Sequence, residues 1–263
     1  VFTFLMEMEG LTFPEAVEQL AKEVGIEIRN DPKESGAARE RDALKELYRR
    51  VAGSFAHLFS QHSCGGDARK YMEGRGITQE VLEAFEIGYA PGGARWLYNF
   101  LREKQYSREF LQKSGLFSRR YPEMSLFRQR VMFPIRNRRA EVIAFGGRAL
   151  GDSTAKYINS PESDLFKKSR ELYGLDLALR EIKLAGEALL VEGYMDVLAC
   201  HQAGIRTAVA PLGTAFTEEQ AAMLHRYCER GVLVFDADGA GISAAERSGR
   251  IAEAQGLKVS VCC

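Results

Sequence analysis

Short apolar runs alternate with helical patterns over the last third of the chain. The runs at 188–191 and 232–235 are aliphatic and β-branched, which predicts two buried strands. The elements expected between and after them are a helix near 196–203, a strand at 207–210, a helix over 217–227, a helix over 242–255 and a strand at 257–261. Strands that alternate with helices in this way predict an α/β domain with a parallel, doubly wound sheet.

Helical periodicity dominates the part of the chain that precedes this domain. The predicted helices are 13–24 with Thr12 as N-cap, 39–60, 67–74, 79–85 with Thr78 as N-cap, and 95–111. Residues 30–38 have the composition of a linker, and 88–91 that of a turn. The pattern changes to strands at 131–135 and 142–145, which flank a charged hairpin tip at 136–139. This part is therefore expected to be α+β.

Carboxylates follow both apolar runs of the α/β domain. Glu192 ends the first run, with Asp196 just beyond it, and Asp236 and Asp238 end the second. Ligands of doubly wound sheets lie beyond the carboxyl ends of the strands, so these acids should gather at one edge. Acids that share a crevice repel one another unless a divalent cation neutralises them, and Mg²⁺ prefers oxygen ligands. A metal site for phosphoryl or nucleotidyl transfer is the favoured interpretation.

A simpler interpretation of these acids is that they are turn residues and helix N-caps. It is the better account of any one Asp taken alone. Glu192 together with the Asp236/Asp238 pair favours the metal site.

Several motifs carry a resemblance to a known family. The stretch VEGYMDV followed by FDADGAG resembles the TOPRIM domain of primases and topoisomerases. The stretches FRQRVMFPI, VIAFGGR, AKYINSPE and LFKKSRELYG extend the resemblance to bacterial DNA primases over nearly the whole chain.

The resemblance implies an order of domains. Residues 1–29 would be the end of a zinc-binding domain, 30–38 a linker, 39–180 the basic N-terminal subdomain of the catalytic core, and 181–263 a TOPRIM domain that is incomplete at its C-terminal end. Zn²⁺ would belong only to the preceding part of the full-length protein, and a replicative helicase would bind a following domain. The chain would thus be truncated at both ends, and we expect it to make primers poorly without the family's further acidic motif.

The implied activity is synthesis of short RNA primers from NTPs on single-stranded DNA. Glu192, Asp236 and Asp238 would hold Mg²⁺, for which Mn²⁺ can substitute, and Asp196 would support them. A further set of positions is implied to contact nucleic acid or nucleotide: Arg75, Arg148, Lys156, Tyr157 and Lys168. Taken alone, each cation is equally a solvated surface residue.

The charge distribution agrees with a polyanionic partner. The chain has 36 Lys and Arg and 36 Asp and Glu, yet residues 95–170 hold 17 of the basic and 7 of the acidic residues, a net charge of +10. Within this stretch, Gly146 and Gly147 would let a backbone or a phosphate approach closely, and Arg148 would grip phosphate. Lys156 and Tyr157 would pair a charge with a stacking ring.

The absence of several sequence motifs limits which classes of protein this chain can belong to. The five cysteines show no metal-ligand spacing, and no apolar run is long enough to span a bilayer, so a cytoplasmic protein without membrane contact is expected. No P-loop motif is present. Two alternatives stay open: another TOPRIM enzyme, a topoisomerase or nuclease, and a non-catalytic DNA-binding scaffold.

Overall fold

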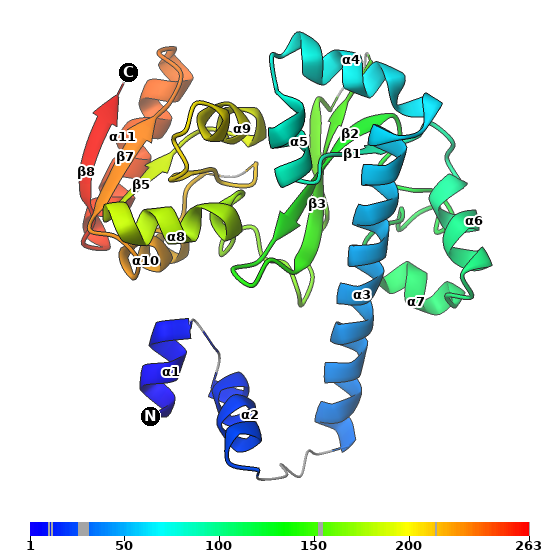
Figure 1. Cartoon of the computed structure of the whole chain (residues 1–263), viewed down its shortest axis with the longest axis horizontal. Coiled ribbons are helices and arrows are strands. Elements are labelled where there is room, and N and C mark those ends of the chain that lie inside the picture. Colours follow the sequence, from blue (N-terminus) through cyan, green and yellow to red (C-terminus); the bar gives the residue numbers. More distant parts are fainter. Residues whose placement is uncertain (10, 12, 26–31, 152–154, 214, 263) are drawn as a thin grey trace. The chain divides into compact units, whose positions relative to one another are not determined.

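The computed structural model describes residues 1–9, 11, 13–25, 32–151, 155–213 and 215–262, in two compact units, Val1–Ala43 and Leu44–Cys263 (Figure 1). The first unit contains α1 (Phe2–Glu9), α2 (Phe13–Glu23) and the beginning of α3 (Pro32–Ser60). The rings of Phe2 and Phe13 lie 5.5 Å apart and join α1 to α2. The helix predicted over 13–24 is confirmed, and its predicted cap Thr12 lies outside the described residues.

The helix predicted over 39–60 begins earlier than expected, because α3 already begins at Pro32, within the segment 30–38 that was predicted as a linker. Proline is favoured at the first position of a helix, and the residues that follow the Gly36 position, Ala-Ala-Arg-Glu-Arg, are strong helix formers. A polar segment with one glycine and one proline can therefore be either a linker or the first turns of a helix.

An antiparallel sheet forms the first half of the second unit. Its strands run in the order β1 (Gly88–Ala90), β2 (Arg130–Arg136), β3 (Val142–Ala149) and β4 (Tyr157–Asn159). The helices around it are the end of α3, the short η1 (Ser63–Gly65), α4 (Gly66–Gly74), α5 (Gln79–Ala84), α6 (Trp96–Glu103) and α7 (Arg108–Lys113).

The strands β2 and β3 of this sheet are buried on both faces. Met132 and Phe145 pack into a core with Phe55 of α3 and Leu97 of α6. Residues next to them on β2, such as Phe133, pack into a second core toward the parallel sheet. Side chains alternate between faces along a strand, so α3 and α6 cover the face that points away from the parallel sheet (Figure 1).

Two predictions in this half are wrong. Residues 88–90, expected as a turn, form β1 and pair with 130–132. The glycine at 88 is needed there, because a Cβ would lie 2.5 Å from the Cβ of Phe55. The single helix expected over 95–111 is two helices, since Gln105 takes a positive φ of 66° and the Ser107 side chain accepts a hydrogen bond from Phe110 N, which caps α7.

The predicted parallel α/β sheet is confirmed in the second half. Its strands run in the order β6 (Ala208–Val209), β5 (Glu187–Leu190), β7 (Arg230–Val234) and β8 (Lys258–Cys262), all parallel. The helices are α8 (Leu175–Ala185), α9 (Tyr194–Gln202), α10 (Glu218–His225) and α11 (Gly239–Ala254). The predicted boundary between residues 180 and 181 falls inside α8, a helix that the sequence pattern did not reveal.

Helices cover both faces of the parallel sheet. Leu190 and Leu233 pack into a core with α8, α10 and α11. Leu189 packs on the opposite side into the core that holds α9 and the antiparallel sheet. The α9 face of the parallel sheet is thus where the two halves of this unit meet.

Candidate functional site

The crevice between the carboxyl ends of β5 and β7 is the switch point of the parallel sheet. From β5 the chain passes through α9 to β6 on one side, and from β7 it passes through α11 to β8 on the other. Loops diverge at such a point and leave space for a ligand. Glu192 follows β5 and Asp236 follows β7, and the Asp236 N–H donates a hydrogen bond to Glu192 Oε1 over 2.6 Å. The structure therefore brings these two predicted residues together.

Asp238 and Asp196 both lie at helix N-termini beside this crevice. Asp238 is the N-cap of α11, and its Oδ1 accepts a hydrogen bond from Gly241 N at 2.7 Å. Asp196 is the third residue of α9, and its Oδ2 accepts from Gly193 N at 3.0 Å. Burial raises the pKa of Asp196, and repulsion from the Asp236 carboxylate raises it further. The capping interpretation of these acids is thus correct for Asp238, without excluding a ligand role.

The chemistry of the acidic edge fits a hard divalent cation. Glu192, Asp236 and Asp238 offer only oxygen donors, and all three side chains are exposed. Glu192 and Asp238 each have one carboxylate oxygen engaged by a backbone N–H. Among the described residues, no group of three or more His, Cys, Asp or Glu side chains is gathered closely enough to hold a metal. The metal set Glu192, Asp236 and Asp238 stays a prediction.

A second group of predicted residues meets around an aromatic ring that the sequence reasoning missed. The Arg148 guanidinium on β3 lies 4.4 Å from the ring centroid of Tyr71 on α4 and 5.5 Å from that of Tyr157 on β4. Arg75 Nε donates to the Tyr71 hydroxyl over 3.1 Å. We call Tyr71, Arg75, Arg148 and Tyr157 the cation–aromatic cluster. The signal for Tyr71 was its position four residues before Arg75, on the same face of one helix.

Arg148 has an unused donor inside this cluster. Its side chain is 9% exposed, and its Nη1 donates to the carbonyl of Ala149 over 2.8 Å. Its Nε is buried and has no hydrogen-bond partner among the described residues. An unsatisfied buried donor costs about 1–3 kcal/mol. A ligand oxygen that accepts from this atom would remove the cost.

Tyr157 is suited to stacking. Burial of its hydroxyl raises its pKa, an effect that Tyr71 strengthens and the charge of Arg148 opposes, so the phenol stays neutral at physiological pH. The residue is 38% exposed, which leaves part of its ring open to a planar ligand.

Tyr194 links the cation–aromatic cluster to the acidic edge. It is the first residue of α9, two positions after Glu192. Its ring stacks on Tyr157 with centroids 5.9 Å apart and on Phe133 at 4.9 Å, and its hydroxyl donates to Asn159 Oδ1 over 2.6 Å. The VEGYMDV motif thus contributes both an acid of the crevice and the ring that supports Tyr157.

The glycines before Arg148 have a different role from the one predicted. They lie inside β3, and a Cβ at Gly146 would lie 2.5 Å from the Tyr194 ring. A Cβ at Gly147 would lie 2.8 Å from the ring of Phe127. These positions are small because side chains of the protein itself fill the space, so the close approach of a phosphate does not explain them.

Lys156 and Lys168 have no contact with the cluster in the described residues. Lys156 is exposed in the segment before β4. Lys168 is partly buried near the start of α10, where its carbonyl accepts from Gln220 Nε2 at 2.9 Å. The charged hairpin tip at 136–139 is also engaged by the protein, since Arg136 pairs with Glu86 at 2.6 Å and Arg138 donates to the Tyr227 hydroxyl over 2.7 Å.

Comparison with known proteins accounts for both halves of the second unit. Residues 55–179 match the family described as "DNA primase catalytic core, N-terminal domain", and residues 189–263 match the family described as "Toprim-like". The RNA polymerase domain of Mycobacterium tuberculosis primase DnaG has 36% sequence identity and a TM-score of 0.77, with 85% of this chain and 76% of that chain covered.

The chain belongs to the DnaG-type DNA primase family.

Other members agree with this assignment. The DNA primase of Treponema pallidum is 40% identical over 261 residues, which cover 98% of this chain and 43% of that protein. The structure titled "DnaG primase catalytic domain bound to ssDNA" is 38% identical with a TM-score of 0.77, and covers 85% of this chain and 71% of that chain. The chain spans about half the length of the curated primases it matches. Membership in the primase family removes the topoisomerase and nuclease alternatives.

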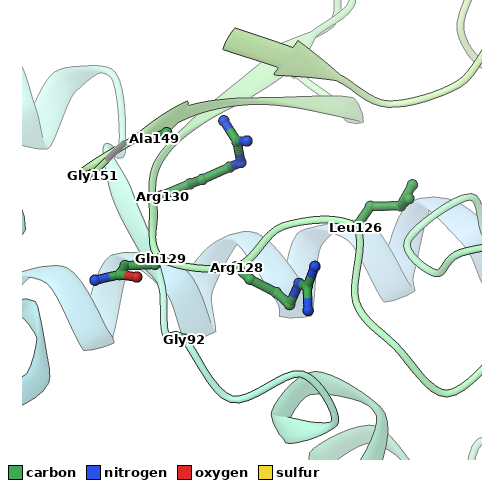
Figure 2. Close-up of a pocket in the computed structure, with 7 residues that line it drawn as sticks. All are labelled: Gly92, Leu126, Arg128, Gln129, Arg130, Ala149 and Gly151. Carbon is green, nitrogen blue, oxygen red and sulfur yellow. The ribbon is translucent and has the colours of Figure 1, made fainter. Parts of the chain in front are cut away.

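The primase core also has a basic pocket that the sequence did not define. Figure 2 shows Arg128 and Arg130 on its walls with Gln129 between them, and Gly92 and Gly151 at its edge. The pocket has a volume of about 350 Å³. Two basic residues of the stretch 95–170, Arg128 and Arg130, therefore line a concave surface. In the described residues, no helix has the length and apolar character needed to cross a membrane.

Proposed function

We propose that this chain is the catalytic part of a DNA primase, which synthesises short RNA primers from NTPs on a single-stranded DNA template. The observation that carries the proposal is the position of Tyr194, two residues from Glu192 and stacked on Tyr157. Through this ring, a crevice of carboxylates is joined to a cluster of arginines and aromatic rings. Nucleotidyl transfer on a polyanion needs both parts side by side.

At the acidic edge, Glu192, Asp236 and Asp238 would hold one or two Mg²⁺ ions, with Mn²⁺ as a substitute. A bound cation there would lower the pKa of an attacking 3′-hydroxyl and offset charge on the α-phosphate. Asp196 would support these ligands from the start of α9, where its carboxylate accepts a hydrogen bond from Gly193 N. Its role would be to keep the Glu192 loop in place.

The template and nucleotides would be bound by the cations near β3 and β4. Tyr157 would stack on a base, and Arg75 and Arg148 would contact phosphate or base oxygens, with the unpaired Nε of Arg148 as a donor. Lys156 and Lys168 would add contacts as point charges. A related DnaG catalytic domain has been solved bound to ssDNA, which supports the same ligand for this chain.

Further partners follow from the family alone. A replicative helicase would bind through a domain outside these residues, Zn²⁺ would belong to a domain that precedes them, and the protein would work in the bacterial cytoplasm.

The acids of the crevice should bind a divalent cation. Mn²⁺ should raise the melting temperature of the chain, because the cation relieves the repulsion between the acids at this edge. Asp236→Ala should fold but lose this rise, whereas Glu246→Ala, an exposed acid on α11, should keep it. In the full-length protein, Asp236→Ala should also abolish primer synthesis on single-stranded DNA.

Thermal melts with and without Mn²⁺ are compared for the three proteins, followed by the primer assay. No Mn²⁺ effect on the parent would favour the non-catalytic scaffold. An equal effect on the parent and on Asp236→Ala would remove Asp236 from the metal site.

A further inference from the structure

Arg130 occupies an unusual place for a residue of the basic stretch. It begins β2, and its side chain is 7% exposed. Its Nη1 donates to the carbonyls of Gly147 at 3.1 Å and Lys156 at 3.3 Å, and its Nη2 donates to the carbonyl of Ala155 at 3.0 Å. Both terminal nitrogens are thus bound to backbone of the protein. Arg128, two residues earlier, is exposed.

The side chain of Arg130 reaches beyond its neighbouring strand. In the sheet order β1-β2-β3-β4, β2 and β4 are separated by β3. A Cβ on Gly147 of β3 would lie 3.0 Å from the Arg130 Cδ, so the glycine leaves the space that the arginine uses. By crossing β3 at this point, the guanidinium reaches the segment that leads into β4.

That segment is joined to the sheet by backbone pairing as well as by Arg130. The strand β4 has three residues, paired with β3 from Tyr157 opposite Arg148 to Asn159 opposite Gly146. Before it, the carbonyl of Lys156 also accepts from Ala149 N at 2.9 Å. Arg130 therefore adds hydrogen bonds from a side chain to the backbone of both Ala155 and Lys156.

We propose that Arg130 is a positioning residue, which holds residues 155 and 156 from behind β3 so that Lys156 and Tyr157 meet nucleic acid, and that it does not itself contact phosphate. The inference rests on the proposed function, in which Lys156 binds phosphate. Lysine cannot replace this arginine, because an ammonium group is a single point, whereas the flat guanidinium spans three carbonyls. Figure 2 shows the neighbouring Arg128 extending to another side of the pocket, and we use it as the matched control.

A double-mutant cycle on DNA binding tests the proposal. The affinity for a fluorescein-labelled oligo(dT) strand is measured against salt for the parent, Arg130→Met, Arg130→Lys, Lys156→Ala, and the combinations with Lys156→Ala. Each lost phosphate contact should flatten the dependence of log K on log salt by about 0.7. We expect the slope to flatten by this amount in Lys156→Ala and in each Arg130 variant, and to flatten no further in the combined variants.

The control cycle pairs Arg128→Ala with Lys156→Ala. Their effects should add because, within the part of the chain that the structure describes, Arg128 makes no hydrogen bond to the Lys156 segment. If the effects of the Arg130 and Lys156 substitutions were additive, the slope of the combined variant would flatten by about 1.4, and this result would overturn the inference. So would retention of the parent slope by Arg130→Lys, which would indicate a direct charge contact.

Thermal melts establish whether each variant folds. If Arg130→Met does not fold, Gly147→Ala takes its place in the cycle, because the added methyl group would displace the Arg130 side chain. An unchanged slope in Lys156→Ala alone would instead contradict the proposed role of Lys156, and the inference with it.

Discussion

At the scale of single residues, the same residue type has different roles in the basic stretch. Arg136 and Arg138 are bound by Glu86 and Tyr227, and Arg130 is bound by backbone carbonyls. Arg148 alone among these four has a buried donor without a partner in the described residues. Binding capacity thus depends on which donors remain unused, and a count of positive charges does not predict it.

Glu171 is a residue whose charge opposes folding. It is partly buried, and burial raises its pKa from 4.5 to about 7, although the charge of Arg138 opposes the rise. A raised carboxyl pKa in the folded state means that the protonated form stabilises the fold. This stability is complete below about pH 4.5 and is lost as the pH rises through 7.

Glu171→Gln should therefore be more stable than the parent at pH 8, on the order of 3 kcal/mol, and about equally stable at pH 4.5. Other titrating groups are common to both proteins and cancel in the difference. Urea unfolding of both proteins at pH 4.5, 6 and 8 measures it. A difference that does not change with pH would show that the Glu171 carboxyl has the same pKa in the folded and unfolded protein, so that burial does not raise it.

At the scale of elements, the contact of α9 with β3 decides how the two halves of the primase core fit together. The Tyr194 ring at the start of α9 lies directly against Gly146, and its neighbours Phe133 and Tyr173 belong to the same core. Tyr173 lies 4.6 Å from the Tyr194 ring in an edge-on contact. This aromatic packing lies two residues along the chain from Glu192, which follows β5.

Gly146→Ala should destabilise the second unit by about 2–4 kcal/mol, because the added methyl group would overlap the Tyr194 ring and force α9 outward. The matched control is Gly53→Ala on the exposed side of α3, where a Cβ has open space. That change should stabilise by about 0.5–1 kcal/mol, since alanine has the higher helix propensity.

Denaturant unfolding of the two variants gives both values. Equal free energies of unfolding for Gly146→Ala and the parent would mean that Tyr194 moves aside without cost, and that its contact with β3 does not hold the halves together.

At the scale of the whole molecule, a neutral chain contains an acidic crevice beside a basic surface. The net charge is zero, yet the stretch 95–170 has a surplus of ten positive charges. Such a separation attracts a polyanion to one surface and divalent cations to the other. Only the basic surface should contribute to the salt dependence of DNA binding.

The combined variant Arg148→Ala, Lys156→Ala and Lys168→Ala should therefore bind single-stranded DNA with a flatter salt dependence. Three lost phosphate contacts predict a slope change of about 2. Fluorescence anisotropy at several salt concentrations measures the slope, with Lys70→Ala and Lys113→Ala as control substitutions of cations outside the predicted set. An unchanged slope would mean that these residues are only solvated.

Local patterns were sufficient to predict much of this architecture. The strands β5 and β7, the helices α9 to α11 and the acids Glu192 and Asp236 were placed correctly, since each depends on periodicity or on the position of a residue relative to a strand end. The cap position of Asp238 was also foreseen as an alternative, because Asp before Gly-Ala-Gly is a local signal. Resemblance to primases added the residues of the basic surface.

Tertiary structure decided what residues distant in sequence do to one another. Tyr71 meets Arg148, Tyr194 fills the space at Gly146, and Arg130 passes Gly147 to reach Lys156. Likewise, 88–90 became a strand because β2 offered a partner and α3 needed a glycine beside it. Each outcome arises from the packing of two elements against each other, and the hydrophobic pattern of either element alone contains no information about its partner.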